Sequence, residues 1–130
     1  MPAPTPPLSC SFVDDDGQSA NLLGRRLRVD GHEEEVTTDG AAAIARLTRS
    51  PVPDALITDF HLPHADGLAV GRYARSHRAC IPIFLVSGYP PPPASAGEPV
   101  DGSVVVMAKP LDYPDLLHRL APALQPVRGV

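Results

Sequence analysis

Short apolar runs alternate along the chain with segments in which apolar residues recur at helical spacing. The apolar runs predict strands at residues 8–13, 35–38, 55–58, 81–86 and 103–108. Helical spacing follows each of the first three strands and the last one, at residues 17–29, 41–47, 68–77 and 113–124. Strands that alternate with helices usually form a parallel sheet with helices on both faces. The pattern therefore predicts a doubly wound α/β fold.

The run from Asp54 to Pro63 contains the most informative of these strands. Its residues 55–58 are apolar or β-branched, and prolines stand at both ends of the segment. Such a strand is typical of the interior of a parallel sheet, buried on both faces. Asp59 follows directly, and open α/β sheets bind their ligands beyond the carboxyl ends of the strands. Asp59 is thus a candidate functional residue.

Prolines are concentrated in two segments that the helical pattern does not include. Residues 1–7 contain four prolines and predict a disordered leader, and residues 88–102 contain five more. Proline removes a backbone donor and clashes with the preceding helical turn. We therefore expect an extended or mobile loop at 88–102, where a helix usually connects parallel strands. The expected organisation is a leader at 1–7, one domain at 8–126 and a tail at 127–130.

Composition narrows the classes of function. A length of 130 residues suits a single domain, and the net charge of −4 without a Lys/Arg cluster argues against a nucleic-acid surface. The sequence has no apolar run long enough to cross a membrane, so we expect a cytoplasmic protein without a membrane partner. Cys10 and Cys80 lie in apolar runs and are expected to be buried reduced thiols.

Polar side chains stand at the ends of four predicted strands. Asp14 and Asp15 follow the first strand, Asp59 the third, Ser87 the fourth and Lys109 the fifth. Right-handed crossovers would bring these residues to one edge of the sheet. Carboxylates suit a hard divalent cation such as Mg²⁺, while a lysine and a hydroxyl suit phosphoryl oxygens.

At these residues the sequence resembles the receiver domain of two-component response regulators. The resemblance runs from Leu8 to about Leu124 and implies a flavodoxin-like five-stranded parallel sheet with strand order 2-1-3-4-5. Four separated segments carry it in the order that the family has: Phe12–Asp16, Thr58–Pro63 followed by Asp66 and Gly67, Val86–Gly88 and Ala108–Pro110.

The resemblance implies a phosphoacceptor. Asp59 would attack the phosphohistidine of a sensor histidine kinase or phosphotransfer protein and hold the phosphoryl group as an acyl phosphate. Asp15, Asp59 and the backbone carbonyl of His61 would bind Mg²⁺, and Asp14 would act mainly through water. The chain would be no enzyme but would assist its own phosphorylation and dephosphorylation, and it would signal by contact with a downstream protein that the sequence does not identify.

The same resemblance gives roles to residues of the last two strands. Ser87 and Lys109 would contact the phosphoryl oxygens, and Gly88 is the small residue that leaves room for that group. The bond between Lys109 and Pro110 is expected to be cis, as in the family.

Two features depart from the family pattern. Val106 stands where the family usually carries an aromatic residue whose rotamer reports phosphorylation, and residues 88–102 replace a helix that often forms the partner face. A receiver subgroup with a reduced helix at this place shows a similar sequence around Tyr89. Tyr89 is accordingly a candidate for part of the switching, or else packs on the loop.

Simpler interpretations stand beside these assignments. The acidic triplet of Asp14, Asp15 and Asp16 also fits a solvated turn in which Asp16 caps a helix. The His61 side chain either flanks the phosphoryl site or faces solvent. Two other functions are open: a docking adaptor that is never phosphorylated, and a phosphatase that forms an aspartyl phosphate. Such phosphatases generally carry a second acid two residues after the nucleophile, where this chain has His61.

Overall fold

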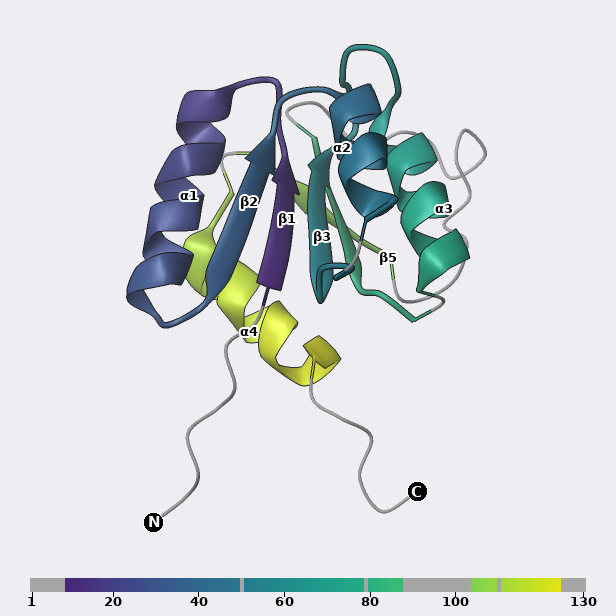
Figure 1. The fold of residues 1–130 in the computed structure, drawn as a ribbon. Coiled ribbons are helices and arrows are strands. Elements are labelled where there is room, and N and C mark those ends of the chain that lie inside the picture. Colours follow the sequence, from purple (N-terminus) through teal and green to yellow (C-terminus); the bar gives the residue numbers. More distant parts are fainter. Residues whose placement is uncertain (1–8, 50, 79, 88–103, 110, 125–130) are drawn as a thin grey trace, which may run out of the picture.

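The computed structural model describes residues 9–49, 51–78, 80–87, 104–109 and 111–124. Five strands form one parallel sheet in the order β2-β1-β3-β4-β5 (Figure 1), which confirms the predicted fold class. The strands are Ser9–Val13 (β1), Glu33–Thr37 (β2), Ala55–Asp59 (β3), Ile83–Ser87 (β4) and Val104–Ala108 (β5). The helices in these ranges are Gly17–Val29 (α1), Gly40–Leu47 (α2), Gly67–His77 (α3) and Tyr113–Leu124 (α4).

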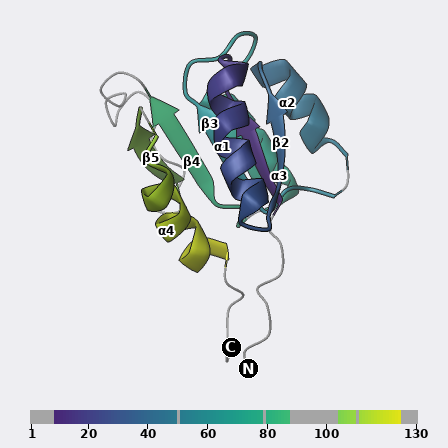
Figure 2. The same ribbon diagram turned by 90° about the vertical axis from the view of Figure 1, so that its left-hand side faces the viewer.

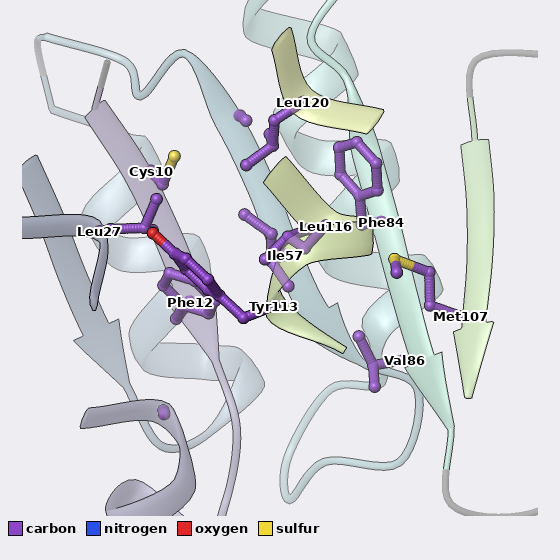
Figure 3. Packing of buried hydrophobic residues seen from close by; sticks show 12 residues of the cluster. Cys10, Phe12, Leu27, Ile57, Phe84, Val86, Met107, Tyr113, Leu116 and Leu120 are labelled. Atoms are coloured by element: carbon purple, nitrogen blue, oxygen red, sulfur yellow. The ribbon is translucent and has the colours of Figure 1, made fainter. Parts of the chain in front are cut away.

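The helices cover both faces of the sheet, as the two ribbon views show (Figure 2). On one face α1 and α4 pack over alternate strand residues, among them Phe12, Ile57 and Phe84, which are all buried (Figure 3). On the other face α2 and α3 pack over the intervening strand residues, such as Leu56 and Leu85. Because side chains alternate along a strand, β3 and β4 contribute to both cores, as their uninterrupted apolar runs predict.

An aspartate precedes each of the four described helices and caps it. Backbone N–H groups in the first turns of α1, α2, α3 and α4 donate to the side chains of Asp16, Asp39, Asp66 and Asp112, respectively. These N–H groups have no partner within the helix, so a side-chain acceptor there stabilises the helix start by about 1 kcal/mol. The caps also place the start of each helix close to the carboxyl end of the preceding strand.

Several predicted boundaries differ from the structure. The second strand begins at Glu33 rather than residue 35, because β2 is an edge strand whose charged side chains reach solvent while its backbone pairs with β1. The fourth strand begins at Ile83, since Pro82 has no N–H to contribute to the ladder. The second helix begins at Gly40, one residue before the predicted start, because Asp39 caps it there.

The two cysteines have different environments. Cys10 is a buried free thiol in β1, as predicted, and burial raises its pKa to about 12. Cys80 is also free but exposed, so the prediction of a buried thiol was wrong at this position. The reason is that Cys80 lies in the turn before β4 and not in the strand itself.

Some sequence-based expectations concern residues outside the described ranges. The proposed leader at 1–7, the proline-rich segment at 88–102 and the tail at 127–130 all fall there. Among the described residues, no helix is long and apolar enough to cross a membrane.

Candidate functional site

The carboxyl ends of β1, β3, β4 and β5 meet at one edge of the sheet. Neighbouring strands are in register there, with Val13 beside Thr58, Asp59 beside Val86 and Ser87 beside Ala108. Strand order reverses around β1, and the crevice of a doubly wound fold lies at such a reversal. The polar residues that follow these strands therefore come together as the sequence predicts.

Three carboxylates form the centre of this edge. One oxygen from each of Asp14, Asp15 and Asp59 lies within 4.8 Å of the others. Asp14 and Asp59 are buried, whereas Asp15 is exposed. The third acid of the predicted triplet, Asp16, instead accepts hydrogen bonds from the Ser19 hydroxyl at 2.9 Å and the Gln18 N–H at 3.2 Å. The triplet thus divides between the site and the cap of α1.

Lys109 connects two of these carboxylates. Its Nζ lies 2.9 Å from Asp59 Oδ2 and 3.5 Å from Asp14 Oδ1. The Lys109 backbone N–H donates to the carbonyl of Ser87 at 2.9 Å, which ties the end of β5 to the end of β4. One ammonium group therefore reaches acids from two different strands.

Burial and charge change the proton affinity of Asp59. Burial, followed by the neighbouring Asp14, raises the pKa of the Asp59 carboxyl to about 7, against the opposing effect of Lys109. Burial tends to lower the pKa of Lys109, but its hydrogen bonds and charge interactions with Asp59 and Asp14 outweigh this and raise the pKa. The lysine stays charged, and the two buried acids repel one another.

The donor set fits a magnesium ion. All three acidic groups offer oxygen ligands, which hard divalent cations prefer, and none of the three is a sulfur or imidazole group. The pKa of Asp59 is raised first by burial and then by Asp14, so Lys109 alone does not offset the cost of a carboxylate charge at this place. A divalent cation bound to these oxygens would supply the missing positive charge.

The other predicted site residues lie around this cluster. Ser87 is buried at the end of β4, one residue beyond the register partner of Asp59. His61 is exposed in the loop between β3 and α3, with its ring edge-on to Phe60 at a centroid distance of 4.8 Å. Val106 is exposed at the middle of the edge strand β5. Three further candidates lie outside the described residues: Gly88, Tyr89 and Pro110.

Sequence reasoning missed a cavity of about 240 Å³ that opens beside the acids. Its walls are mainly apolar and come from α1, from the carboxyl ends of β1, β3 and β4, and from Leu111 after β5. Leu22 of α1, which lines it, is 62% exposed. Two adjacent leucines in the predicted helix at 17–29, Leu22 and Leu23, were the available signal, but sequence spacing alone does not show that both border one cavity.

Comparisons with known proteins agree with this arrangement. A family model described as the response regulator receiver domain matches residues 11–121. The transcriptional regulatory protein TrcR of Mycobacterium tuberculosis is 30% identical over 114 residues, which cover 88% of this chain and 44% of that protein. The response regulator MprA of Mycobacterium leprae is 37% identical over 75 residues, covering 58% and 32%. The chain thus spans less than half the length of these relatives.

Solved structures show the same fold. The receiver domain of the hybrid histidine kinase CckA superposes with a TM-score of 0.73 at 28% identity, covering 90% of this chain and 99% of that one. A response regulator receiver protein from Sinorhizobium medicae superposes with a TM-score of 0.81, covering 91% and 94%. At 23% identity, the second match supports the fold alone.

Proposed function

The chain belongs to the response regulator receiver domain family, and we propose that Asp59 accepts a phosphoryl group within a two-component system. The observation that carries this proposal is the environment of Asp59. Its carboxylate is buried at a strand end, 2.9 Å from Lys109 and grouped with Asp14 and Asp15. A purely structural aspartate would not need two more acids beside it.

The proposed donor is the phosphohistidine of a sensor histidine kinase or of a phosphotransfer protein. An oxygen of Asp59 attacks the phosphorus, a new P–O bond forms, and the P–N bond to the imidazole breaks with its electron pair leaving on nitrogen. The product is an acyl phosphate on Asp59 and a free histidine on the donor. Attack needs the carboxylate form of Asp59, which the Lys109 ammonium favours.

Mg²⁺ is the proposed cofactor. Asp15, Asp59 and the backbone carbonyl of His61 would hold it directly, and Asp14 would act mainly through water. When bound, the ion would neutralise the charge that develops on the transferring phosphoryl oxygens. Asp14 is the less available ligand, because its Oδ1 already accepts the Asp16 N–H at 2.8 Å and faces Lys109 at 3.5 Å.

Lys109 and Ser87 are the proposed partners of the phosphoryl group. Lys109 already faces Asp59, so its ammonium would follow the charge from the carboxylate to the acyl phosphate. Ser87 is buried one residue beyond the register partner of Asp59, at the adjacent strand end. Fixed donors aimed at the developing charge are the usual way in which proteins promote phosphoryl transfer.

The proposed output is a change in a surface that binds a downstream protein. The printed name of TrcR describes a transcriptional regulatory protein, and the match covers 44% of it. For this chain we propose a protein target of unknown identity. Val106 is aliphatic and exposed on β5, so a change of aromatic rotamer at that position is not part of the proposed mechanism.

Labelling of Asp59 tests the proposal. Incubation with Mg²⁺ and acetyl phosphate, or with a phosphorylated kinase, should add one phosphoryl group, detected by intact-mass measurement. Asp59→Asn should abolish it, while the matched variant Asp115→Asn, at a partly exposed position of α4, should be labelled normally. Undiminished labelling of Asp59→Asn would refute the assignment.

Two further assays separate the alternatives. A docking adaptor that is never phosphorylated should bind neither Mg²⁺ nor beryllofluoride, a phosphoryl mimic, whereas we expect binding of both at Asp59. A phosphatase should hydrolyse phosphate esters through many cycles. We expect at most one turnover per chain, because His61 occupies the position of the second acid.

A further inference from the structure

The loop between β3 and α3 carries the residues that follow Asp59 along the edge of the site. Its first residue is tied to the sheet, because the Phe60 N–H donates to the carbonyl of Val86 at 2.9 Å. Its far end closes on the same residue, since the Gly67 N–H donates to the carbonyl of Phe60 at 2.8 Å. Both contacts lie at the base of the loop and leave its tip, residues 62–65, to be held by other groups.

The first turn of α2 contacts that tip. The Gly40 N–H donates to the carbonyl of Pro63 at 3.0 Å, and the Ala65 N–H donates to the same oxygen at 2.8 Å. The position of Gly40 is itself fixed by the cap of α2, in which Asp39 Oδ1 accepts the Ala42 N–H at 2.7 Å. The Pro63 carbonyl is therefore held by the helix and by its own loop together.

The contact leaves no space for a side chain at Gly40. A Cβ atom built there would lie 1.9 Å from the carbonyl oxygen of Ala65 and 2.7 Å from the Ala65 Cβ, and real Cβ atoms essentially never come within 3.0 Å of such atoms. The oxygen belongs to the backbone, so no rotamer change relieves the overlap. A side chain at this position would push the loop tip away by about 1 Å.

The loop tip also holds an uncommon backbone conformation. His64, between Pro63 and Ala65, has a φ of 71°, in the left-handed region that non-glycine residues rarely adopt. Its Nδ1 lies 3.9 Å from Asp39 Oδ2, the residue that caps α2. A conformation of this kind persists where surrounding contacts determine it, and here those contacts come from Gly40 of α2, from its cap Asp39 and from the loop itself.

We propose that Gly40 is a positioning residue for the Mg²⁺ site. By letting the loop tip rest on the backbone of α2, it sets the location of the His61 carbonyl, two residues before Pro63. The inference rests on the proposed function, in which that carbonyl is a metal ligand. Metal sites tolerate ligand shifts of only about 0.5 Å, so a displacement of about 1 Å at the tip is large enough to matter.

A pair of glycine substitutions tests the proposal. Gly40 and Gly17 are the first residues of α2 and α1, and each follows a capping aspartate. A Cβ at Gly17 would meet Thr38 Cγ2 at 3.5 Å, an ordinary contact. In calorimetric titration with MgCl₂, Gly40→Ala should weaken Mg²⁺ binding about tenfold, whereas Gly17→Ala should bind like the wild type.

Labelling kinetics distinguish positioning from general damage. With acetyl phosphate as donor, Gly40→Ala should need about tenfold more Mg²⁺ for half its maximal rate, and saturating Mg²⁺ should restore most of that rate. Unchanged Mg²⁺ affinity in Gly40→Ala would overturn the inference. A wild-type protein that binds no Mg²⁺ would overturn the proposed function as well, so the two failures are distinguishable.

A measurement on the wild type covers the case in which Gly40→Ala does not fold. If the loop links Gly40 to the metal ligands, Mg²⁺ binding must in turn stabilise the hydrogen bond of the Gly40 N–H. Amide exchange followed by NMR should therefore show stronger protection of Gly40 in MgCl₂ than in EDTA, with little change at Gly24 in the middle of α1. Equal protection of Gly40 in both conditions would contradict the proposal.

Discussion

Lys109 Nζ lies 2.9 Å from Asp59 Oδ2, an ion pair between residues that are far apart in the sequence and adjacent at the edge of the sheet. The same ammonium lies 3.5 Å from Asp14. It therefore offsets the repulsion between two buried carboxylates, and it does so from a side chain that is about one third exposed. This arrangement leads to predictions about stability as well as about phosphorylation.

Replacing Lys109 by methionine should destabilise the metal-free protein by about 1–2 kcal/mol. The two carboxylates lose their shared cation, and partial exposure of the lysine keeps the effect below that of a fully buried pair. Urea unfolding at pH 8 in EDTA measures the loss. In MgCl₂ the difference from the wild type should shrink, because the bound ion supplies positive charge; an equal difference in both conditions would count against a shared cation site.

The stability of the metal-free protein should fall between about pH 4 and pH 7. The pKa of Asp59 is about 7 in the folded protein against an ordinary value of 3.8, so in this interval the folded state keeps a proton that the unfolded state has lost. The contribution of Asp59 to the free energy of unfolding is fully present at low pH and is lost as the pH rises through 7.

Asp59→Asn removes this titration and isolates its contribution. Unfolding in EDTA should show the variant to be more stable than the wild type at pH 8, by on the order of 1–2 kcal/mol, with a smaller difference at pH 5. We expect a smaller difference in stability than the full pKa shift of Asp59 implies, because solvent reaches the edge of the site. A difference that does not vary with pH would show that Asp59 does not titrate near 7.

Tyr113→Phe should lower stability by about 1–2 kcal/mol without changing Mg²⁺ affinity. The Tyr113 hydroxyl donates to Asp30 Oδ2 at 2.7 Å, which joins the start of α4 to the end of α1. The guanidinium of Arg26 also lies over the ring, 4.2 Å from its centroid. Thermal unfolding measures the loss of stability, and calorimetric titration of the same sample measures the Mg²⁺ affinity. Weakened Mg²⁺ binding would mean that the contact of Tyr113 with Asp30 also supports the Mg²⁺ site.

Adjacent residues of β5 should respond differently to truncation. Met107 is buried against the α1 and α4 face, whereas Val106 is 46% exposed. Met107→Ala should cost about 2–4 kcal/mol, and Val106→Ala about 0.5 kcal/mol or less. Urea unfolding compares them. A large loss at Val106 would show that this side chain is covered in solution.

Much of the fold followed from local signals in the sequence. Mostly apolar runs identified the buried strands, since a strand covered on both faces has few positions for polar side chains. The cap that Asp16 forms could also be inferred from the sequence, because a capping side chain satisfies backbone donors within the same few residues. Boundaries failed where tertiary pairing decides them: β2 extends back to Glu33 because β1 offers a partner, although Glu33–Glu35 carry charge.

The candidate site could likewise be predicted from the sequence in part only. The sequence by itself determined which polar residues end the strands, and the order of strands and helices required Asp14, Asp15, Asp59 and Lys109 to share one edge. Only the tertiary structure decided that Lys109 faces both Asp59 and Asp14 and that burial raises the pKa of Asp59. It also decided that Gly40 contacts the loop between β3 and α3. Those properties depend on distances between side chains and on exclusion of water, which arise only when separate segments pack together.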